Sequence, residues 1–213
     1  MSKKEILFVV VIIILAVGFW YSRELQYTFD SVVSTVELYI TDHQVLGIGA
    51  FAGLAALSAM LSPFSSVPLV PFAVAVWGKT LTFLFLLSGW LLGGAATYAI
   101  GRYALYGLLG HLIPFDRIEK YRRELSKGSE FWLVFLFRLA MPAEIPGYVL
   151  GSLKYFFDKY MLATVMAELP VALVTVLASH SFVTRDPLSV GLWVLGAGLL
   201  MIVAFHYFRK KTR

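Results

Sequence analysis

The chain has 213 residues, of which 59% are hydrophobic and only 15% are charged, and its formal net charge is +5. Soluble globular domains carry about 25% charged residues, so this composition excludes an ordinary soluble domain and indicates a membrane protein. The absence of cysteine excludes a disulfide framework and any cysteine-ligated metal.

The first apolar segment covers residues 6–21 and follows a basic start. Such a start is also typical of a secretory signal peptide, but no small-residue cleavage site follows, and an aromatic triplet at 19–21 ends the run. Aromatic side chains gather at membrane interfaces. The pattern therefore favours a retained transmembrane helix, and an interfacial helix is expected over the acidic segment 29–42.

The positive charges gather at the ends of the apolar segments, whereas the segment after the first helix is acidic. Cytoplasmic loops of membrane proteins carry an excess of lysine and arginine. The distribution predicts that both termini and the loop at 102–127 lie in the cytoplasm. Because the basic residues sit at helix ends, they indicate no nucleic-acid partner.

The second apolar region, residues 45–77, is interrupted by three prolines: Pro63, Pro68 and Pro71. Proline removes a backbone donor and breaks a helix, and freed backbone groups are tolerated at membrane depth only inside protein or beside a wet cavity. We therefore expect a re-entrant hairpin with its tip near 62–71. Ser65 and Ser66 at this tip are candidates either for satisfying freed backbone groups or for binding a substrate.

Residues 81–100 form the next predicted span. Small and aromatic residues recur along it and just after it: Gly89, Gly93, Tyr98 and Gly101. Small residues at four-residue spacing let helices approach closely in lipid. Arg102 follows at the cytoplasmic end, either as an arginine that snorkels to the interface or as a substrate ligand.

The central loop is predicted to contain a short amphipathic helix over residues 116–127. Asp116 occupies the N-cap position, Glu119 follows three residues later, and Gly128 ends the helix. Basic residues flank its apolar stripe, so the helix either lies on an anionic leaflet or serves as a solvated connector.

Residues 131–153 form a second broken region. Two prolines mark its hairpin tip near 141–147: Pro142 and Pro146. Arg138 comes just before this tip, and an arginine inside the membrane costs roughly 3 kcal/mol or more unless it is paired or hydrated. Its candidate partners are the Glu144 carboxylate and a lipid or polyprenyl phosphate, which arginine binds bidentately.

The last two predicted spans cover residues 160–179 and 191–208. Glu168 lies inside the first of them, and an intramembrane carboxylate indicates a functional site by default. Glu144 and Glu168 are therefore the candidates for proton coupling, with a protonated, hydrogen-bonded side chain as the structural alternative for Glu168. No His, Asp or Glu spacing resembles a metal site, no cofactor is implied, and no hydrolase, phosphate-loop or zinc-protease motif indicates an enzyme.

A hairpin followed by a span occurs twice in opposite orientation, which predicts an all-α integral membrane fold with an inverted repeat. A core at 45–179 is flanked by the spans at 6–21 and 191–208, all within a single domain covering 1–213. If the two broken regions are instead kinked full spans, the chain has six spans and both termini still lie inside. A homo-oligomer is compatible with either arrangement.

Five features point to one family: the proline-broken first hairpin, the glycine-rich span ending in Gly101-Arg102, the basic amphipathic loop, Phe135-x-x-Arg138-x-x-x-Pro142, and Gly151. Together they resemble the DedA family, the SNARE-associated or VTT-domain membrane proteins, over about residues 47–178. The resemblance implies a lipid-handling function, namely translocation or scrambling of phospholipids or undecaprenyl phosphate, with two inverted re-entrant hairpins that meet in the membrane.

The chain departs from many bacterial members of that family at two places. It has Ser65-Ser66 where they carry an acidic residue, and Ala143-Glu144 where they carry a second arginine. Glu144 and Glu168 are the candidates for supplying carboxylates from other positions. The resemblance favours a lipid flippase or scramblase and implies the bacterial plasma (inner) membrane as its location. A proton-coupled carrier of small solutes and a non-transporting membrane scaffold or assembly factor are the alternatives.

Overall fold

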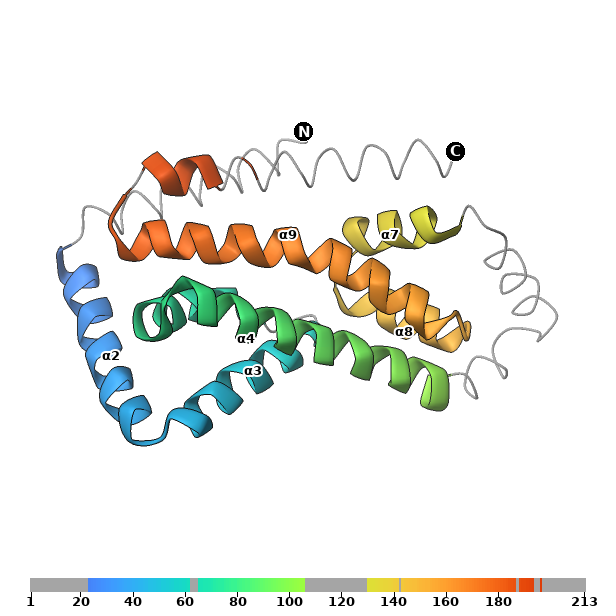
Figure 1. The fold of residues 1–213 in the computed structure, drawn as a ribbon, viewed down its shortest axis with the longest axis horizontal. Coiled ribbons are helices and arrows are strands. Elements are labelled where there is room, and N and C mark those ends of the chain that lie inside the picture. The colour runs from blue at the N-terminus through green and yellow to red at the C-terminus, as the bar shows by residue number, and fades with distance from the viewer. Residues whose placement is uncertain are drawn as a thin grey trace.

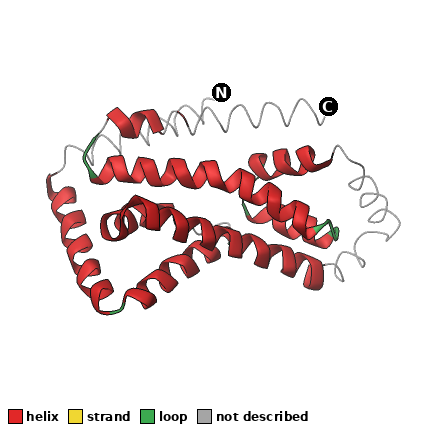
Figure 2. Cartoon of the chain, in the orientation of Figure 1, coloured by secondary structure: helices red, strands yellow, loops and turns green. Residues whose placement is uncertain are grey.

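The structure is a computed structural model that describes residues 23–61, 65–105, 130–141, 143–186, 188–193 and 196. Within these ranges every regular element is a helix and no strand is present (Figure 2). The predicted all-α fold is thus confirmed for the described residues. The following predictions lie outside them: the first span at 6–21, the amphipathic helix at 116–127, most of the last span at 191–208, and the positions of Pro63 and Pro142.

The described chain begins with α2 (Arg23–Asp42), which includes the predicted interfacial segment at 29–42 and starts six residues before it. After His43 it continues as α3 (Gln44–Met60), an apolar helix that ends where Leu61 adopts an extended conformation. The first part of the predicted hairpin is therefore a regular helix up to the segment that contains the prolines.

A single 3₁₀ turn, η1 (Val67–Leu69), leads into the long helix α4 (Val70–Ile100). Pro68 and Pro71 lie within the first two positions of η1 and α4. A backbone N–H has no intrahelical acceptor there, so these prolines begin helices and do not interrupt them.

Gly78 divides α4 into a short helix at 70–77 and a longer one at 79–100. Its φ of 72° and ψ of 171° are non-helical, and glycine reaches such a positive φ without the penalty that a Cβ would bring. The predicted boundary between the first hairpin and the next span thus falls at Gly78. A five-residue π-helical turn, η2 (Gly101–Leu105), carries the chain on past Arg102.

Two stretches are long and apolar enough to cross a membrane: Val67–Ala104, which includes α4, and α9 (Phe157–Val183). At 1.5 Å per residue, the 79–100 helix is about 33 Å long and α9 about 40 Å, compared with about 30 Å of bilayer hydrocarbon. α9 extends the predicted span at 160–179 by about one turn at each end and holds Pro170 in its interior.

The second broken region consists of two short helices, α7 (Glu130–Ala140) and α8 (Glu144–Ser152). Pro146 is the third residue of α8, so it lies in the first turn, where its missing N–H costs no helical hydrogen bond. The break is therefore confined to 141–143 and does not reach 147 as predicted. α7 is about 16 Å long and α8 about 13 Å, so neither crosses a bilayer alone.

α9 and the 79–100 part of α4 run side by side along the long axis of the molecule (Figure 1). α3 and the start of α4 lie toward one end, with α2 across that end, whereas α7 and α8 lie toward the other end. The two broken regions thus approach the middle of the molecule from opposite ends.

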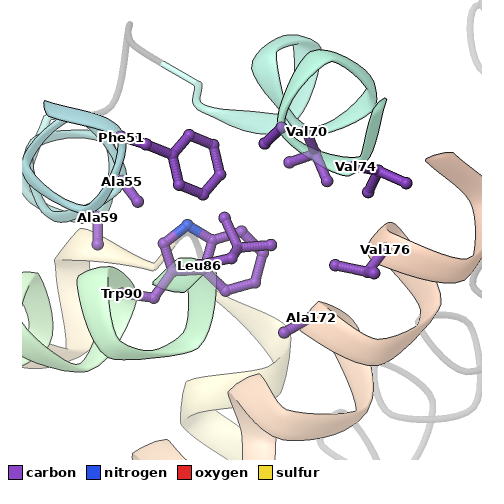
Figure 3. Packing of buried hydrophobic residues seen from close by; sticks show 10 residues of the cluster. Phe51, Ala55, Ala59, Val70, Val74, Leu86, Trp90, Ala172 and Val176 are labelled. Atoms are coloured by element: carbon purple, nitrogen blue, oxygen red, sulfur yellow. The ribbon is translucent and has the colours of Figure 1, made fainter. Parts of the chain in front are cut away.

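A buried apolar cluster forms where α3, both parts of α4 and α9 meet (Figure 3). Its members come from all of these helices: Phe51, Ala55, Ala59, Val70, Ala73, Val74, Leu86, Trp90, Ala172 and Val176. Helix association in lipid depends on packing more than on the hydrophobic effect. The cluster therefore stabilises the arrangement by close contact among small and branched side chains.

Glycines lie where helices approach most closely. A Cβ added to Gly89 would lie 2.6 Å from a carbonyl oxygen of α3, and one added to Gly93 would be closer still to the next turn of that helix. Gly101 and Gly151 lie in the same way between the end of α4 and α8, where an added Cβ would overlap backbone atoms of the facing segment. These four positions set how near the broken regions come to α4.

Candidate functional site

The first helix break is held to the middle of the spanning part of α4 by Ser66. This side chain is buried, and its hydroxyl accepts hydrogen bonds from the Ser58 hydroxyl at 2.9 Å and from Trp90 Nε1 at 3.1 Å. Ser65 is exposed, and its hydroxyl accepts a hydrogen bond from the Val67 amide at 3.3 Å. Of the two serine candidates, Ser65 thus satisfies a freed backbone donor, while Ser66 is engaged with other side chains.

The second helix break is held to the middle of α9 by an ion pair. Nη2 of Arg138 lies 2.6 Å from Oε1 of Glu168, and Nη1 donates to the carbonyl of Ala143 in the turn. The Arg138 side chain is 1% exposed and that of Glu168 is 12% exposed. Gly94 of α4 lies alongside, because a Cβ there would be 3.8 Å from Nη2. The pair therefore ties α7 and the turn to α9 beside α4.

Glu144, expected as the protein partner of Arg138 because it is near in sequence, does not form this pair. It is buried as the first residue of α8, where a carboxylate complements the helix dipole. Within the described ranges its carboxylate makes no ion pair or hydrogen bond. The carboxylate that neutralises Arg138 comes from the neighbouring spanning helix instead.

The guanidinium of Arg138 is closed off in this conformation. Two of its nitrogens are engaged, and Nε is buried without a hydrogen-bond partner among the described residues. A phosphate ligand for Arg138, the functional alternative in the sequence interpretation, would therefore require the pair with Glu168 to open.

Two stacked tyrosines connect α4 with α9 next to this pair. The rings of Tyr98 and Tyr160 lie 5.0 Å apart at 25°. The Tyr160 hydroxyl donates to the Gly94 carbonyl at 2.9 Å, while the Tyr98 hydroxyl donates to the Tyr155 carbonyl and accepts from Arg102 Nη1 at 2.8 Å. Arg102, which lies in η2 just after α4, is thus oriented by Tyr98 of the preceding span.

The two broken regions contact each other through Tyr148 of α8. Its hydroxyl donates to the carbonyl of Met60, the last residue of α3, at 3.2 Å. A carbonyl at the end of a helix has no intrahelical donor, so this tyrosine satisfies a group that the first break leaves free.

Sequence reasoning missed three of these residues: Trp90, Tyr148 and Tyr160. Each lies in an apolar run, where the pattern alone indicates a hydrophobic residue. A buried tyrosine or tryptophan usually needs a partner for its polar end, and that need was the signal available in the sequence. Within the described ranges, no group of His, Asp or Glu side chains is arranged to hold a metal ion.

The sequence model of the VTT domain matches residues 63–181, more than half of the chain. The chain belongs to the VTT-domain family. The predicted resemblance to the DedA family is confirmed, because the VTT domain is the domain of the DedA or SNARE-associated family. No match was found among curated proteins or among solved structures.

The matched VTT region contains both helix breaks and the side chains that hold them, from Ser66 to Glu168, as well as Arg102. α2 and α3 precede it. VTT-domain proteins of the DedA type are membrane proteins, and the two apolar helices of this chain fit that class.

Proposed function

We propose that this VTT-domain protein is a lipid translocase, a flippase or scramblase that moves phosphate-bearing headgroups across the bilayer between two re-entrant hairpins. One observation carries the proposal: both helix breaks contact the middle of a spanning helix, at Trp90 and at Glu168. Non-helical backbone is tolerated at that depth only inside protein or beside water. Pairs of broken helices are also how secondary transporters build a site at the midplane.

The lengths of the helices favour re-entrant hairpins over kinked full spans. α7 and α8 are each too short to cross, and both lie at the same end of the molecule (Figure 1). α3 and the 70–77 helix lie together at the opposite end. In an inverted repeat, each hairpin would enter the membrane from its own side and return to that side.

Single cysteines in the cysteine-free chain test the re-entrant arrangement. A cysteine at Ser65 should react with an impermeant thiol reagent from the same side as one at Ser34, because the first hairpin would open toward the α2 end. A cysteine at Ala143 should react from the same side as one at Asp158, at the start of α9. Labelling of either tip from the other side would contradict re-entrant hairpins and favour full spans.

Lipid exchange in vesicles tests the translocase proposal. Vesicles that contain the purified protein and a fluorescent phospholipid or polyprenyl phosphate should expose inner-leaflet lipid to an external quencher faster than protein-free vesicles. The double variant Asp30→Asn, Arg185→Gln removes an ion pair whose side chains are more than half exposed, and it should retain the activity. No acceleration over protein-free vesicles with any headgroup would refute the proposal.

The Glu168 carboxylate supports a second candidate, a proton-coupled carrier of small solutes, because intramembrane carboxylates often form part of proton relays. The same vesicles separate the two. Solute uptake driven by a proton gradient, without lipid exchange, would favour the carrier, and absence of both activities would favour a scaffold or assembly factor.

A further inference from the structure

α2 packs against the rest of the molecule through a single stripe of side chains. Partly buried residues recur along it at three- and four-residue spacing: Gln26, Phe29, Val33, Val36 and Ile40. Such spacing corresponds to one face of a helix. None of the described side chains of α2 is buried, whereas α3, α4 and α9 each bury several. Few buried contacts mean low local stability, so α2 is held less firmly than the helices it crosses.

The end of α2 that adjoins α3 forms a compact pivot. One residue, His43, separates the two helices, with a non-helical φ of −134° and ψ of 51°. Ile40 lies directly against Gly47 of α3, because a Cβ added to this glycine would be 2.9 Å from Cγ1 of Ile40. The short connection keeps the two helix ends together, so a movement of α2 away from α9 is a rotation about His43.

The other half of α2 contacts two neighbouring helices through Phe29. The centroid of its ring lies 4.7 Å from that of Phe72, in the 70–77 helix, and 5.6 Å from that of Phe182, near the end of α9. Aromatic rings at such separations attract one another. Phe29 therefore ties the first broken region to the end of α9.

An ion pair lies beside Phe29 in the sequence. Nη2 of Arg185 donates to Oδ2 of Asp30 at 2.6 Å, and both side chains are more than half exposed. Arg185 follows α9 with a left-handed φ of 58°, in a Schellman turn where glycine is the usual residue. An arginine there has a backbone cost that glycine avoids, and it contributes the charge that reaches α2.

A cavity of about 100 Å³ lies beneath α2 at these contacts. Its lining comes from α2, from the 70–77 helix through Ala75, and from the end of α9 through Phe182 and Val183. Protein interiors leave few voids larger than a water molecule, so the packing where these three elements meet is incomplete. The Phe29 contacts and the exposed ion pair are thus interactions that a small perturbation can break.

We propose that α2 is a releasable strap. In the closed state, Phe29 and the Asp30–Arg185 pair tie the 70–77 helix to the end of α9, and in the open state α2 has rotated about His43 and the tie is lost. α2 precedes the matched VTT region at 63–181, so the strap acts on the family domain from outside it. In taking the strap as a control on passage between the two halves, the inference rests on the proposed translocase function.

Distances between spin labels on the full chain in lipid nanodiscs test whether α2 opens. Labelled cysteines at two exposed residues, Ser34 of α2 and Leu173 of α9, should give a main shorter distance and a minor longer one. Phe29→Ala should raise the ratio of the longer to the shorter population about tenfold or more, because two aromatic contacts are lost. Asp30→Asn should raise it about twofold to fivefold, as expected for an exposed pair.

Two controls accompany these measurements. Tyr27→Ala removes the aromatic side chain two positions before Phe29, which is 71% exposed, and should leave the populations unchanged. Labels at Leu84 of α4 and Leu173 of α9 should keep one distance in every variant, because α4 and α9 stay packed. A response to Tyr27→Ala as large as that to Phe29→Ala would overturn the proposal, and so would a single unchanging α2–α9 distance in the wild type and in Phe29→Ala.

Ionic strength separates the ion pair from the packing. The screening length falls from about 10 Å at 0.1 M salt to about 3 Å at 1 M. This increase in salt should therefore raise the open population of the protein that has Asp30, but not that of Asp30→Asn. An equal response in both would contradict a latch made by the Asp30–Arg185 pair.

Locking the strap tests its control of passage. Cysteines in place of Asp30 and Arg185, joined by a short reducible crosslinker, should slow lipid exchange in vesicles, and reduction should restore it. The single variant Asp30→Cys, treated with the same reagent, should exchange lipid normally. Undiminished exchange with the strap locked would overturn its role. If the distances show opening but the wild type exchanges no lipid, the strap is supported and only the translocase function is refuted.

Discussion

Glu168→Leu is expected to lower the free energy of unfolding by about 3–5 kcal/mol, because it leaves the buried Arg138 guanidinium without its carboxylate. Arg138→Met should have a similar effect by leaving Glu168 unpaired. The double variant should recover most of the loss, since apolar residues of similar size often replace a buried ion pair at little cost. Equilibrium unfolding in mixed micelles of detergent and dodecyl sulfate measures all three variants as a double-mutant cycle.

The pair Arg185–Asp30 is the matched control for this cycle. Its N–O distance is also 2.6 Å, but its side chains are 54% and 56% exposed. Exposed pairs contribute about 0.2–1 kcal/mol, so the coupling in the Arg185→Met, Asp30→Leu cycle should be several times smaller. Equal coupling in the two cycles would mean that Arg138 and Glu168 are hydrated. Coupling between Arg138 and Glu144 would mean that Glu144, the residue nearer in sequence, is the partner of Arg138.

Lipid exchange adds a second readout to the Arg138 and Glu168 cycle. We expect exchange to stay lost in the double variant even where stability recovers, because the variant lacks the charged pair at the second break. Recovery of both properties would assign the pair a purely structural role. The substrate path would then have to be traced through Arg102 instead.

Gly89→Ala is expected to destabilise the protein by about 1–3 kcal/mol, the usual cost of overpacking a close contact. The added Cβ would lie 2.6 Å from both the Ala52 carbonyl oxygen and the Ala55 Cβ, so α3 would have to move away from α4. Gly53→Ala is the control, because nothing lies within 4 Å of a Cβ there. Alanine is the better helix former, so this variant should gain about 0.5–1 kcal/mol.

Thermal unfolding of the two alanine variants in the same detergent should therefore give shifts of opposite sign. A loss at Gly53 as large as that at Gly89 would indicate that another surface covers the exposed face of α3, as in an oligomer. No loss at Gly89 would contradict the close approach of α3 and α4.

The sequence predicted the helices and their breaks better than it predicted the contacts. Apolar runs and the prolines placed the breaks near 62–71 and 141–147, but the described prolines of these regions, Pro68, Pro71 and Pro146, lie at helix starts, where an absent N–H does no harm. The second break was predicted too long because Pro146 lies in the first turn of α8 and not in the break. Whether a proline begins a helix or breaks one depends on which backbone groups lack partners, and composition does not show this.

Arg138 illustrates what a local reading of the sequence leaves out. Glu144 is six residues away and Glu168 is thirty residues away, so nearness in sequence favoured the wrong carboxylate. Glu168 is the one carboxylate within the predicted span at 160–179. That was the signal in the sequence that pointed to it as the partner of Arg138. Glu168 reaches Arg138 because α7 packs against α9, in a buried cluster that includes Val134, Tyr160 and Ala163.

A neutral hydrogen bond, from the Tyr148 hydroxyl to the carbonyl of Met60, joins the two broken regions. Interhelical hydrogen bonds in membranes contribute about 0.6 kcal/mol on average, which is about a threefold preference for the closed contact. This hydrogen bond is a weaker link than the buried Arg138–Glu168 ion pair that holds the second break to its own helix. In the proposed translocase, so weak a link would let a passage open between the two halves without nucleotide or an ion gradient. That would suit passive equilibration of the two leaflets better than uphill pumping.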